Sequence, residues 1–303
     1  MGQSERMLQK IQNFLEDRDF ESMDEANAFL EGITAKLNAG EEPEVDDMSP
    51  DKRAQELIYD AWEAKRREER LKLAEQALAL YPECADAYVI LAEDKARTLE
   101  EAKEFYALGV AAGERALGEK FFRENKGSFW GILKTRGYMR ARQGLYRCLW
   151  SLGQKEEAIA HCEEMLSLNP NDNQGVRYDL AAYLFETNDL DRLSRLIKKY
   201  TGDSSAFWQY SRALLAYYQS GENKKANREL RRALEKNPFV PAYLLEGRAL
   251  PKELPEFYAF GSHEEAILYV ASFYGGWYRK PDSLLWLARG TAVLLADLCE
   301  EDE

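Results

Sequence analysis

Residues 153–170 read GQKEEAIAHCEEMLSLNP, and residues 221–238 read GENKKANRELRRALEKNP. The two segments share a turn glycine, a small alanine, a leucine and a final Asn-Pro at the same relative positions. Equivalent residues, such as Pro170 and Pro238, lie 68 residues apart, which is twice the roughly 34-residue period of the tetratricopeptide repeat. Glycine permits a tight turn, alanine lets two helices touch, and proline ends the second helix. The sequence therefore predicts an all-α protein, a tetratricopeptide-like α-solenoid of stacked helical hairpins, whose concave face is of the kind that holds other proteins.

The periodic region does not cover the whole chain. Residues 1–39 predict an N-terminal helix pair outside the repeat, which either caps the solenoid or forms a separate arm. Residues 40–50, which begin GEEPEVDD, predict a flexible acidic linker. We expect the solenoid over residues 51–250. Prolines break the chain after that point, and the last helices predict a C-terminal helical cap over residues 251–303 that covers the exposed end of the stack.

The predicted solenoid contains an insertion. Pro82 and Pro170 lie 88 residues apart, which is 20 more than two repeats require. The stretch 118–137 has that length, and it is too apolar for a free loop. Phe129 and Trp130 fill no repeat position in it, so they predict either an anchor for a partner or a flap that covers the solenoid.

Five arginines fall on the helices that should line the concave face: Arg136, Arg140, Arg147, Arg177 and Arg212. Guanidinium pairs bidentately with carboxylate, so this strip predicts a site for an acidic peptide or a C-terminal carboxylate. Gln143 and Asn173 add amides that could bond to a peptide backbone, although residues such as Asn173 also cap helices. The alternative is that the arginines pair with acidic residues of neighbouring helices and bind no partner.

Composition narrows the range of partners and compartments. The 303 residues carry a formal net charge of −13 and a pI near 4.9, which argues against nucleic acid or an anionic membrane as a partner. No run approaches 18 apolar residues and no signal peptide is recognisable, so we expect a cytoplasmic protein. The cysteines are scattered and predict reduced, packed thiols: Cys84, Cys148, Cys162 and Cys299.

Signals for catalysis are weak. The chain has two histidines, His161 and His263, and neither lies in a nucleophile or metal-binding motif. We therefore expect no enzyme activity, no cofactor and no metal. Two functions remain: a scaffold or adaptor that holds a partner segment in the concave groove, or a structural subunit of a homo-oligomer or larger assembly.

The C-terminal third carries a family resemblance. Residues 237–245 read NPFVPAYLL and are followed by Leu250-Pro251, and Gly261-Ser262 precede Glu265-Ala266-Ile267 and Tyr269. This pattern resembles the C-terminal signature of the suppressor-of-tumorigenicity-seven family, over about residues 51–298. The resemblance implies a scaffold with degenerate tetratricopeptide repeats, similar to smaller bacterial relatives, and it brings no catalytic residues. Animal members are regarded as membrane proteins, and this localisation is not expected for a chain without a membrane segment.

Overall fold

The computed structural model describes residues 2–16, 20–38 and 48–301, with backbone alone at positions 2, 3, 14–16, 36–38 and 298–301. Across these ranges every regular element is a helix, in agreement with the predicted all-α class. The chain divides into two compact units, residues 1–173 and residues 174–303. Most of the predicted linker at 40–50 lies outside the described residues.

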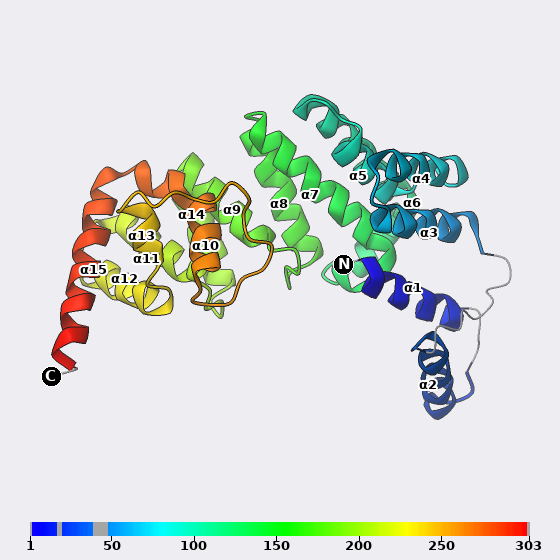
Figure 1. Ribbon diagram of the computed structural model, residues 1–303, viewed down its shortest axis with the longest axis horizontal. Helices are drawn as coiled ribbons and strands as arrows, with labels where there is room; N and C mark the ends of the chain where they lie inside the picture. The colour runs from blue at the N-terminus through cyan, green and yellow to red at the C-terminus, as the bar shows by residue number, and fades with distance from the viewer. Residues whose placement is uncertain (1, 17–19, 39–47, 302–303) are drawn as a thin grey trace. The chain divides into compact units, whose positions relative to one another are not determined.

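The first unit begins with α1 and ends after α8 (Figure 1). Its helices are, in chain order, α1 (Gly2–Glu16), α2 (Met23–Asn38), α3 (Pro50–Glu63), α4 (Arg67–Leu80), α5 (Ala85–Asp94), α6 (Leu99–Asn125), the short 3-10 helices η1 (Phe129–Gly131) and η2 (Leu133–Thr135), α7 (Arg136–Ser151) and α8 (Lys155–Leu168).

Helices α3 to α8 form three pairs, in which α3 packs on α4, α5 on α6, and α7 on α8. The first helices of the pairs also contact one another, α3 with α5 and α5 with α7, and together they form a surface that we call the α3–α5–α7 face. Fully buried alanines such as Ala54, Ala74 and Ala87 surround Ile58 in the core. Such small side chains let helices approach closely while the interior stays well packed.

The predicted insertion at 118–137 starts at a kink in α6. Gly118 has φ 73° and ψ 154°, a conformation that breaks the helical path and that glycine adopts without strain. The 3-10 helices η1 and η2 then lead to α7. Phe129 is completely buried because its ring packs against Phe122 and Tyr138. The insertion is therefore folded into the first unit, and Phe129 is not accessible to a partner.

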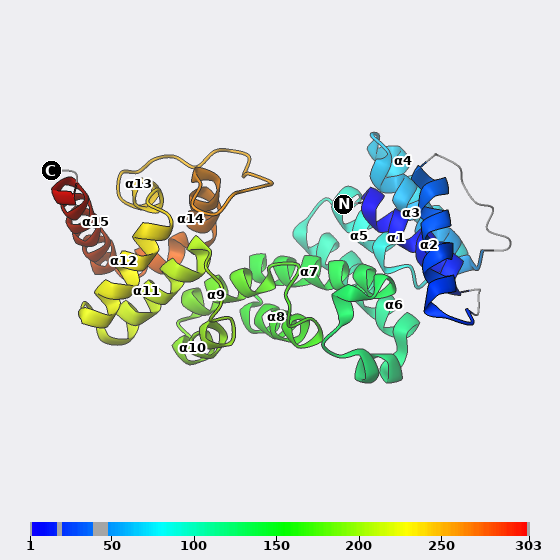
Figure 2. The same cartoon turned by 90° about the horizontal axis from the view of Figure 1, so that it is seen from below.

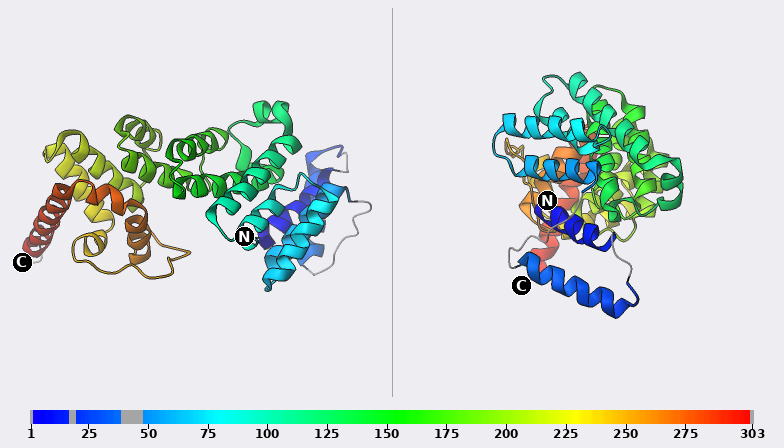
Figure 3. Two further views of the ribbon diagram at one scale, coloured as in Figure 1. Left: turned by 90° about the horizontal axis from the view of Figure 1, so that it is seen from above. Right: turned by 90° about the vertical axis from the view of Figure 1, so that its right-hand side faces the viewer.

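The second unit contains the remaining helices. They are α9 (Val176–Thr187), α10 (Leu190–Lys199), α11 (Ala206–Ser220), α12 (Lys224–Lys236), α13 (Val240–Leu244), α14 (His263–Tyr278) and α15 (Pro281–Glu301). Helix α9 packs on α10 and α11 on α12, while α15 contacts α12, α13 and α14. A long segment without regular structure joins α13 to α14, and it runs as an extended loop beside them (Figure 3).

Proline and left-handed residues set the helix boundaries that the sequence indicated. Helices α4, α8 and α12 each end two residues before a proline, namely Pro82, Pro170 and Pro238. Gly153, Asn188 and Gly221 follow the first helices of three pairs and have φ of 79°, 60° and 65°. Asn188 shares the positive φ of the two glycines and is left-handed (φ 60°, ψ 30°), a conformation that asparagine tolerates better than most residues.

The C-terminal helices do more than cover an end of a stack. Helix α14 packs against both α9 and α11, and it also contacts α13 (Figure 2). Its buried side includes the aromatic side chains of Tyr269, Phe273 and Trp277. Within the region 251–303, for which a cap was predicted, α14 packs along both α9 and α11.

Two further sequence expectations can be compared with the structure. Within the described ranges, none of the helices is both long and apolar enough to cross a bilayer. Cys84, Cys148 and Cys162 are buried free thiols, as predicted. The side chain of Cys299 lies outside the described residues.

A candidate partner-binding face beneath helix α1

Helix α1 lies against α3 and is attached to it by one arginine (Figure 1). Arg6 Nη2 is 2.8 Å from Glu56 Oε2 and 3.0 Å from Asp60 Oδ1. Its Nη1 is 3.6 Å from Glu63 Oε2. The three carboxylates share one side of α3 because their spacings of four and three residues correspond to about one helical turn each. Charge therefore fixes α1 along this side of α3.

Glu5, the preceding residue, bonds to α7. Its carboxylate accepts hydrogen bonds from both Nη atoms of Arg140, at 3.0 Å each, and from Nη1 of Arg136, at 3.1 Å. The Glu5 side chain is only 5% exposed. Arg136 and Arg140, which the sequence predicted to bind a carboxylate of a partner, thus bind a carboxylate of the same chain.

Arg140 also forms a bidentate pair with Asp86 of α5. The Nε–Oδ1 and Nη2–Oδ2 distances are 2.7 and 2.6 Å, and Asp86 is almost fully buried. The Arg140 guanidinium lies over the ring of Trp62, 4.7 Å from its centre. We call Glu5, Asp86, Arg136 and Arg140 the ionic cluster. Its two carboxylates and two guanidinium groups balance in formal charge, as buried ions require.

The cluster shifts the pKa values of its members. Burial alone would raise the pKa of Glu5, but the hydrogen bonds and charges of Arg140 and Arg136 outweigh it and hold the pKa below the ordinary 4.5. Burial would lower the pKa of Arg140, and the charges of Asp86 and Glu5 outweigh it and raise the pKa. Glu5 is therefore ionised at neutral pH, and its contact with α7 depends on that charge.

The most deeply buried of the described side chains of α1 are polar. Among its described side chains Glu5 and Asn13 are buried, whereas Leu8 is 49% exposed. A cavity of about 340 Å³ remains beside α1, lined by Gln9 and Gln12 of α1 and by residues of α3, α5 and α7. Of the described apolar side chains of α1, Met7 and Ile11 are half-buried. Helix α1 is thus held by charge and leaves space on the α3–α5–α7 face.

The α9–α11 side of the second unit is covered in a different way. Phe273 of α14 packs its ring 6.0 Å from Phe185 of α9 and 6.2 Å from Phe207 of α11. Tyr269 of α14 lies 5.3 Å from Tyr210 of α11. All of these side chains are buried, so α14 forms part of a hydrophobic core. The α3–α5–α7 face of the first unit is the better candidate for an exchangeable contact.

Comparison with known proteins places the chain in a family. A family model described as "ST7 protein" matches residues 44–215, more than half of the sequence. The chain belongs to the ST7 family. A second model, described as "Transcriptional repressor TCF25", matches residues 135–301. The ST7 match includes Asp86, Arg136 and Arg140 but begins after α1, so Glu5 lies outside it.

Two curated ST7 relatives illustrate the similarity. A protein ST7 homolog of Caenorhabditis elegans is 26% identical over 271 residues, which cover 77% of this chain and 50% of the relative. A suppressor of tumorigenicity 7 protein-like of Homo sapiens is 28% identical over 252 residues, which cover 75% of this chain and 43% of the relative. The chain spans about half the length of these relatives.

Two arginines of the predicted strip belong to the second unit of this ST7-family chain. Arg177 on α9 donates to Asp203 at 2.9 Å and to the Tyr178 hydroxyl at 2.7 Å. Arg212 on α11 donates to the backbone carbonyl of Thr201. Of the five predicted arginines, Arg136 and Arg140 belong to the ionic cluster. Arg136, Arg140 and Arg177 each bind an acidic side chain of the same chain.

The other predicted site residues of the first unit lie outside the cluster or beside it. The Trp130 carbonyl accepts a hydrogen bond from Arg136 Nε at 3.1 Å, so Trp130 helps to position Arg136. Gln143 is partly buried on α7, and Arg147 on the same helix is exposed beside the Tyr146 ring. Asn173 is exposed and accepts a hydrogen bond from Asn169, a contact typical of a turn. Trp130 thus supports the ionic cluster through its backbone carbonyl.

The sequence prediction missed Glu5 and Asp86, the acidic half of the cluster. Asp86 had a signal, since it is the one charged residue in the apolar run ADAYVILA at 85–92. A charge within a buried run usually has a partner, because a buried unpaired ion is costly. Glu5 had no comparable signal, since α1 is rich in polar residues.

Proposed function

We propose that this ST7-family chain is a non-catalytic, tetratricopeptide-like scaffold or adaptor whose first unit holds an acidic segment of a partner protein. The segment occupies the position of α1 on the α3–α5–α7 face, with a carboxylate in place of that of Glu5. The observation that carries this proposal is the contact of Glu5 with Arg136 and Arg140, which is recognition of one acidic helix by two positioned arginines. Helix-in-groove binding also places a helix of one chain on the surface of another, although there the apolar face of the helix makes the contact.

The polar character of the contact supports exchange of α1 for a partner. Helix α1 is tethered to the unit, so it competes at an effective concentration on the order of millimolar. A partner must therefore gain contacts that α1 lacks. The 340 Å³ cavity offers them, because its walls include Tyr59, Tyr81 and Leu117 beside the polar groups. A segment that combines one carboxylate with an apolar side chain fits this face better than α1 does.

A capture experiment with the full-length chain tests the proposal. We compare the wild-type chain with Glu5→Gln, which weakens α1 docking, and with Glu31→Gln, a matched charge change at an exposed position of α2. Bound proteins from native lysate are identified by mass spectrometry. A peptide of residues 2–16 is added as the competitor, either with the native sequence or with the Glu5→Gln substitution.

The expected result is a partner that is enriched on Glu5→Gln and unchanged on Glu31→Gln. The native peptide should displace this partner, and the substituted peptide should not. Identical partners on all three chains, insensitive to both peptides, would move the binding surface away from α1. Absence of any partner on the three chains would contradict the scaffold role.

A role as a structural subunit has an observation of its own. In the loop between α13 and α14, Phe257 and Phe260 are 83% and 72% exposed, and Leu254 is exposed beside them. Exposed apolar patches on soluble proteins often mark association surfaces. Light scattering, which reports the mass in solution, distinguishes self-assembly from the scaffold role.

A further inference from the structure

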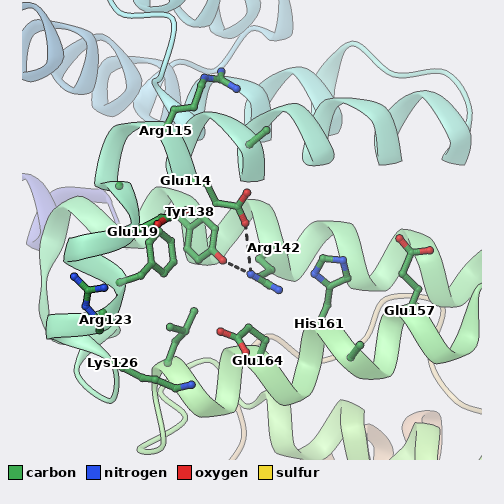
Figure 4. Close-up of a pocket in the computed structure, with 15 residues that line it drawn as sticks. Glu114, Arg115, Glu119, Arg123, Lys126, Tyr138, Arg142, Glu157, His161 and Glu164 are labelled. Atoms are coloured by element: carbon green, nitrogen blue, oxygen red, sulfur yellow. Dashed lines mark hydrogen bonds and ion pairs between the residues drawn. The ribbon is translucent and has the colours of Figure 1, made fainter.

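A second cavity of the first unit, of about 1140 Å³, lies between α6, α7 and α8 (Figure 4). Its walls include residues on both sides of the Gly118 kink, so the changed direction of α6 helps to form it. Phe122, Ala160 and Leu168 supply apolar surface. A cavity of this size is large enough for a drug-sized organic molecule.

Two polar atoms at this cavity lack hydrogen-bond partners among the described residues: Arg142 Nε and His161 Nδ1. Both atoms are buried, and the Arg142 side chain is only 14% exposed. Figure 4 shows the two side chains next to each other, from α7 and α8. Arg142 uses Nη1 to bond to the Tyr138 hydroxyl and lies 3.9 Å from Glu114, which leaves the Nε side of the guanidinium directed to other partners. Buried polar atoms in native proteins are nearly always bonded, so these two require an explanation.

The charged side chains that line the cavity differ in their exposure to solvent. The titratable groups that line it are Glu114, Arg115, Glu119 and Arg123 on α6, Lys126 just after α6, Tyr138 and Arg142 on α7, and Glu157, His161 and Glu164 on α8. Glu114, Glu119 and Glu157 are exposed, as are Arg115, Arg123 and Lys126, so these charges are hydrated and balance one another. Glu164 is partly buried, and Figure 4 shows its side chain near that of Arg142. The Arg142 side chain, which is 14% exposed, supplies a permanent positive charge in the buried part of the cavity.

His161 is neutral at physiological pH. Burial lowers the pKa of His161 to about 4, and the nearby positive charge of Arg142 contributes to the decrease. A neutral imidazole can donate from Nδ1 in one tautomer. Arg142 and His161 can therefore offer two adjacent N–H groups and one positive charge.

We propose that this cavity binds a small organic molecule that carries an oxyanion, carboxylate or phosphate, with Arg142 Nε and His161 Nδ1 as donors to its oxygens. The Nε side of a guanidinium fits the geometry of such groups. The apolar body of the ligand lies against Phe122 and Leu168. The ligand contacts no member of the ionic cluster, although Tyr138 lines both this cavity and the one beside α1.

The two histidines of the chain provide a direct test with the full-length protein. Histidine ring signals are followed by NMR while benzoate, phenyl phosphate or the uncharged analogue benzamide is added. His263, which stacks on Phe239 in the second unit, is the internal control. We expect saturable shifts of the His161 signals with benzoate or phenyl phosphate, little effect of benzamide, and constant His263 signals. The bound oxyanion should also raise the pKa of His161 above about 4.

Two variants test whether Arg142 binds the ligand, and the two anions distinguish a carboxylate from a phosphate. Arg142→Met should weaken binding by about 10- to 100-fold, because a hydrogen bond to a charged group is lost. Arg66→Met, at an exposed arginine of the same unit, should leave it unchanged. Tighter binding of benzoate indicates a carboxylate ligand, and tighter binding of phenyl phosphate indicates a phosphate. Equal binding of benzamide, equal shifts at both histidines, or no saturable shift of His161 would overturn the proposal, even if Arg142→Met does not fold.

Discussion

Arg140 bonds to two carboxylates at once, one from α1 and one from α5, and its removal should have a large effect on stability. Replacement by Met leaves Asp86 buried and without its bidentate partner, which costs about 3–5 kcal/mol for a buried ion pair. Arg115→Met is the matched control, because Arg115 is exposed and its pair with Glu83 is worth about 1 kcal/mol or less. Urea unfolding followed by circular dichroism measures both variants. A loss for Arg140→Met no larger than that of the control would show that the cluster does not stabilise the fold.

Charge reversal of Arg140 should disturb the fold as well as any binding. Arg140→Glu would place a third carboxylate beside Glu5 and Asp86, so loss of binding could result from loss of structure. The sequence placed Arg140 correctly on a first helix, because helix faces follow from local spacing. It could not identify the partners, since Asp86 is 54 residues away and Glu5 is 135 residues away. Ion pairs between distant segments leave no periodic pattern in a sequence.

Helix α1 is the element whose position should depend on pH. The pKa of Glu5 is lowered in the docked state, so docking is favoured above the ordinary Glu pKa of 4.5 and is lost as pH falls through the lower docked value. We expect the hydrogen-exchange protection of residues 4–13, corrected for the intrinsic rate, to decrease in acid below about pH 4.5 while α4 stays protected. Glu5→Gln should lose this protection already at pH 7. Protection of α1 that is equal in wild type and Glu5→Gln would mean that the ionic contact does not hold the helix.

The helices themselves were largely predictable, and their long-range packing was not. Pro170, Pro238 and the turn residues Gly153 and Gly221 act within a few residues of chain, so the sequence indicates where helices end. The aromatic side chains of α14 indicate burial but do not say against which helix. Its packing on α9 and α11 results from contacts such as Phe273 with Phe185, which are 88 residues apart in the chain. The cavity beside α1 and the cavity between α6, α7 and α8 also depend on long-range contacts. In the sequence, only the 20-residue insertion at 118–137 indicated the second of these cavities.

For the molecule as a whole, the two proposed functions predict different masses in solution, because a scaffold can be a monomer and a structural subunit self-assembles. The assembly role predicts that exposed aromatic side chains of the loop between α13 and α14 become buried between copies, because each buries apolar surface worth about 25 cal/mol per Å². The wild-type chain should then exceed its monomer mass of 34.9 kDa in light scattering, increasingly so at higher concentration. Phe257→Ser/Phe260→Ser should restore the monomer mass. Leu80→Ser, an exposed apolar position of the first unit, is the control and should still associate. A mass of 34.9 kDa at every concentration would exclude assembly through this loop and leave the scaffold role, since a monomer keeps the α3–α5–α7 face available to a different partner.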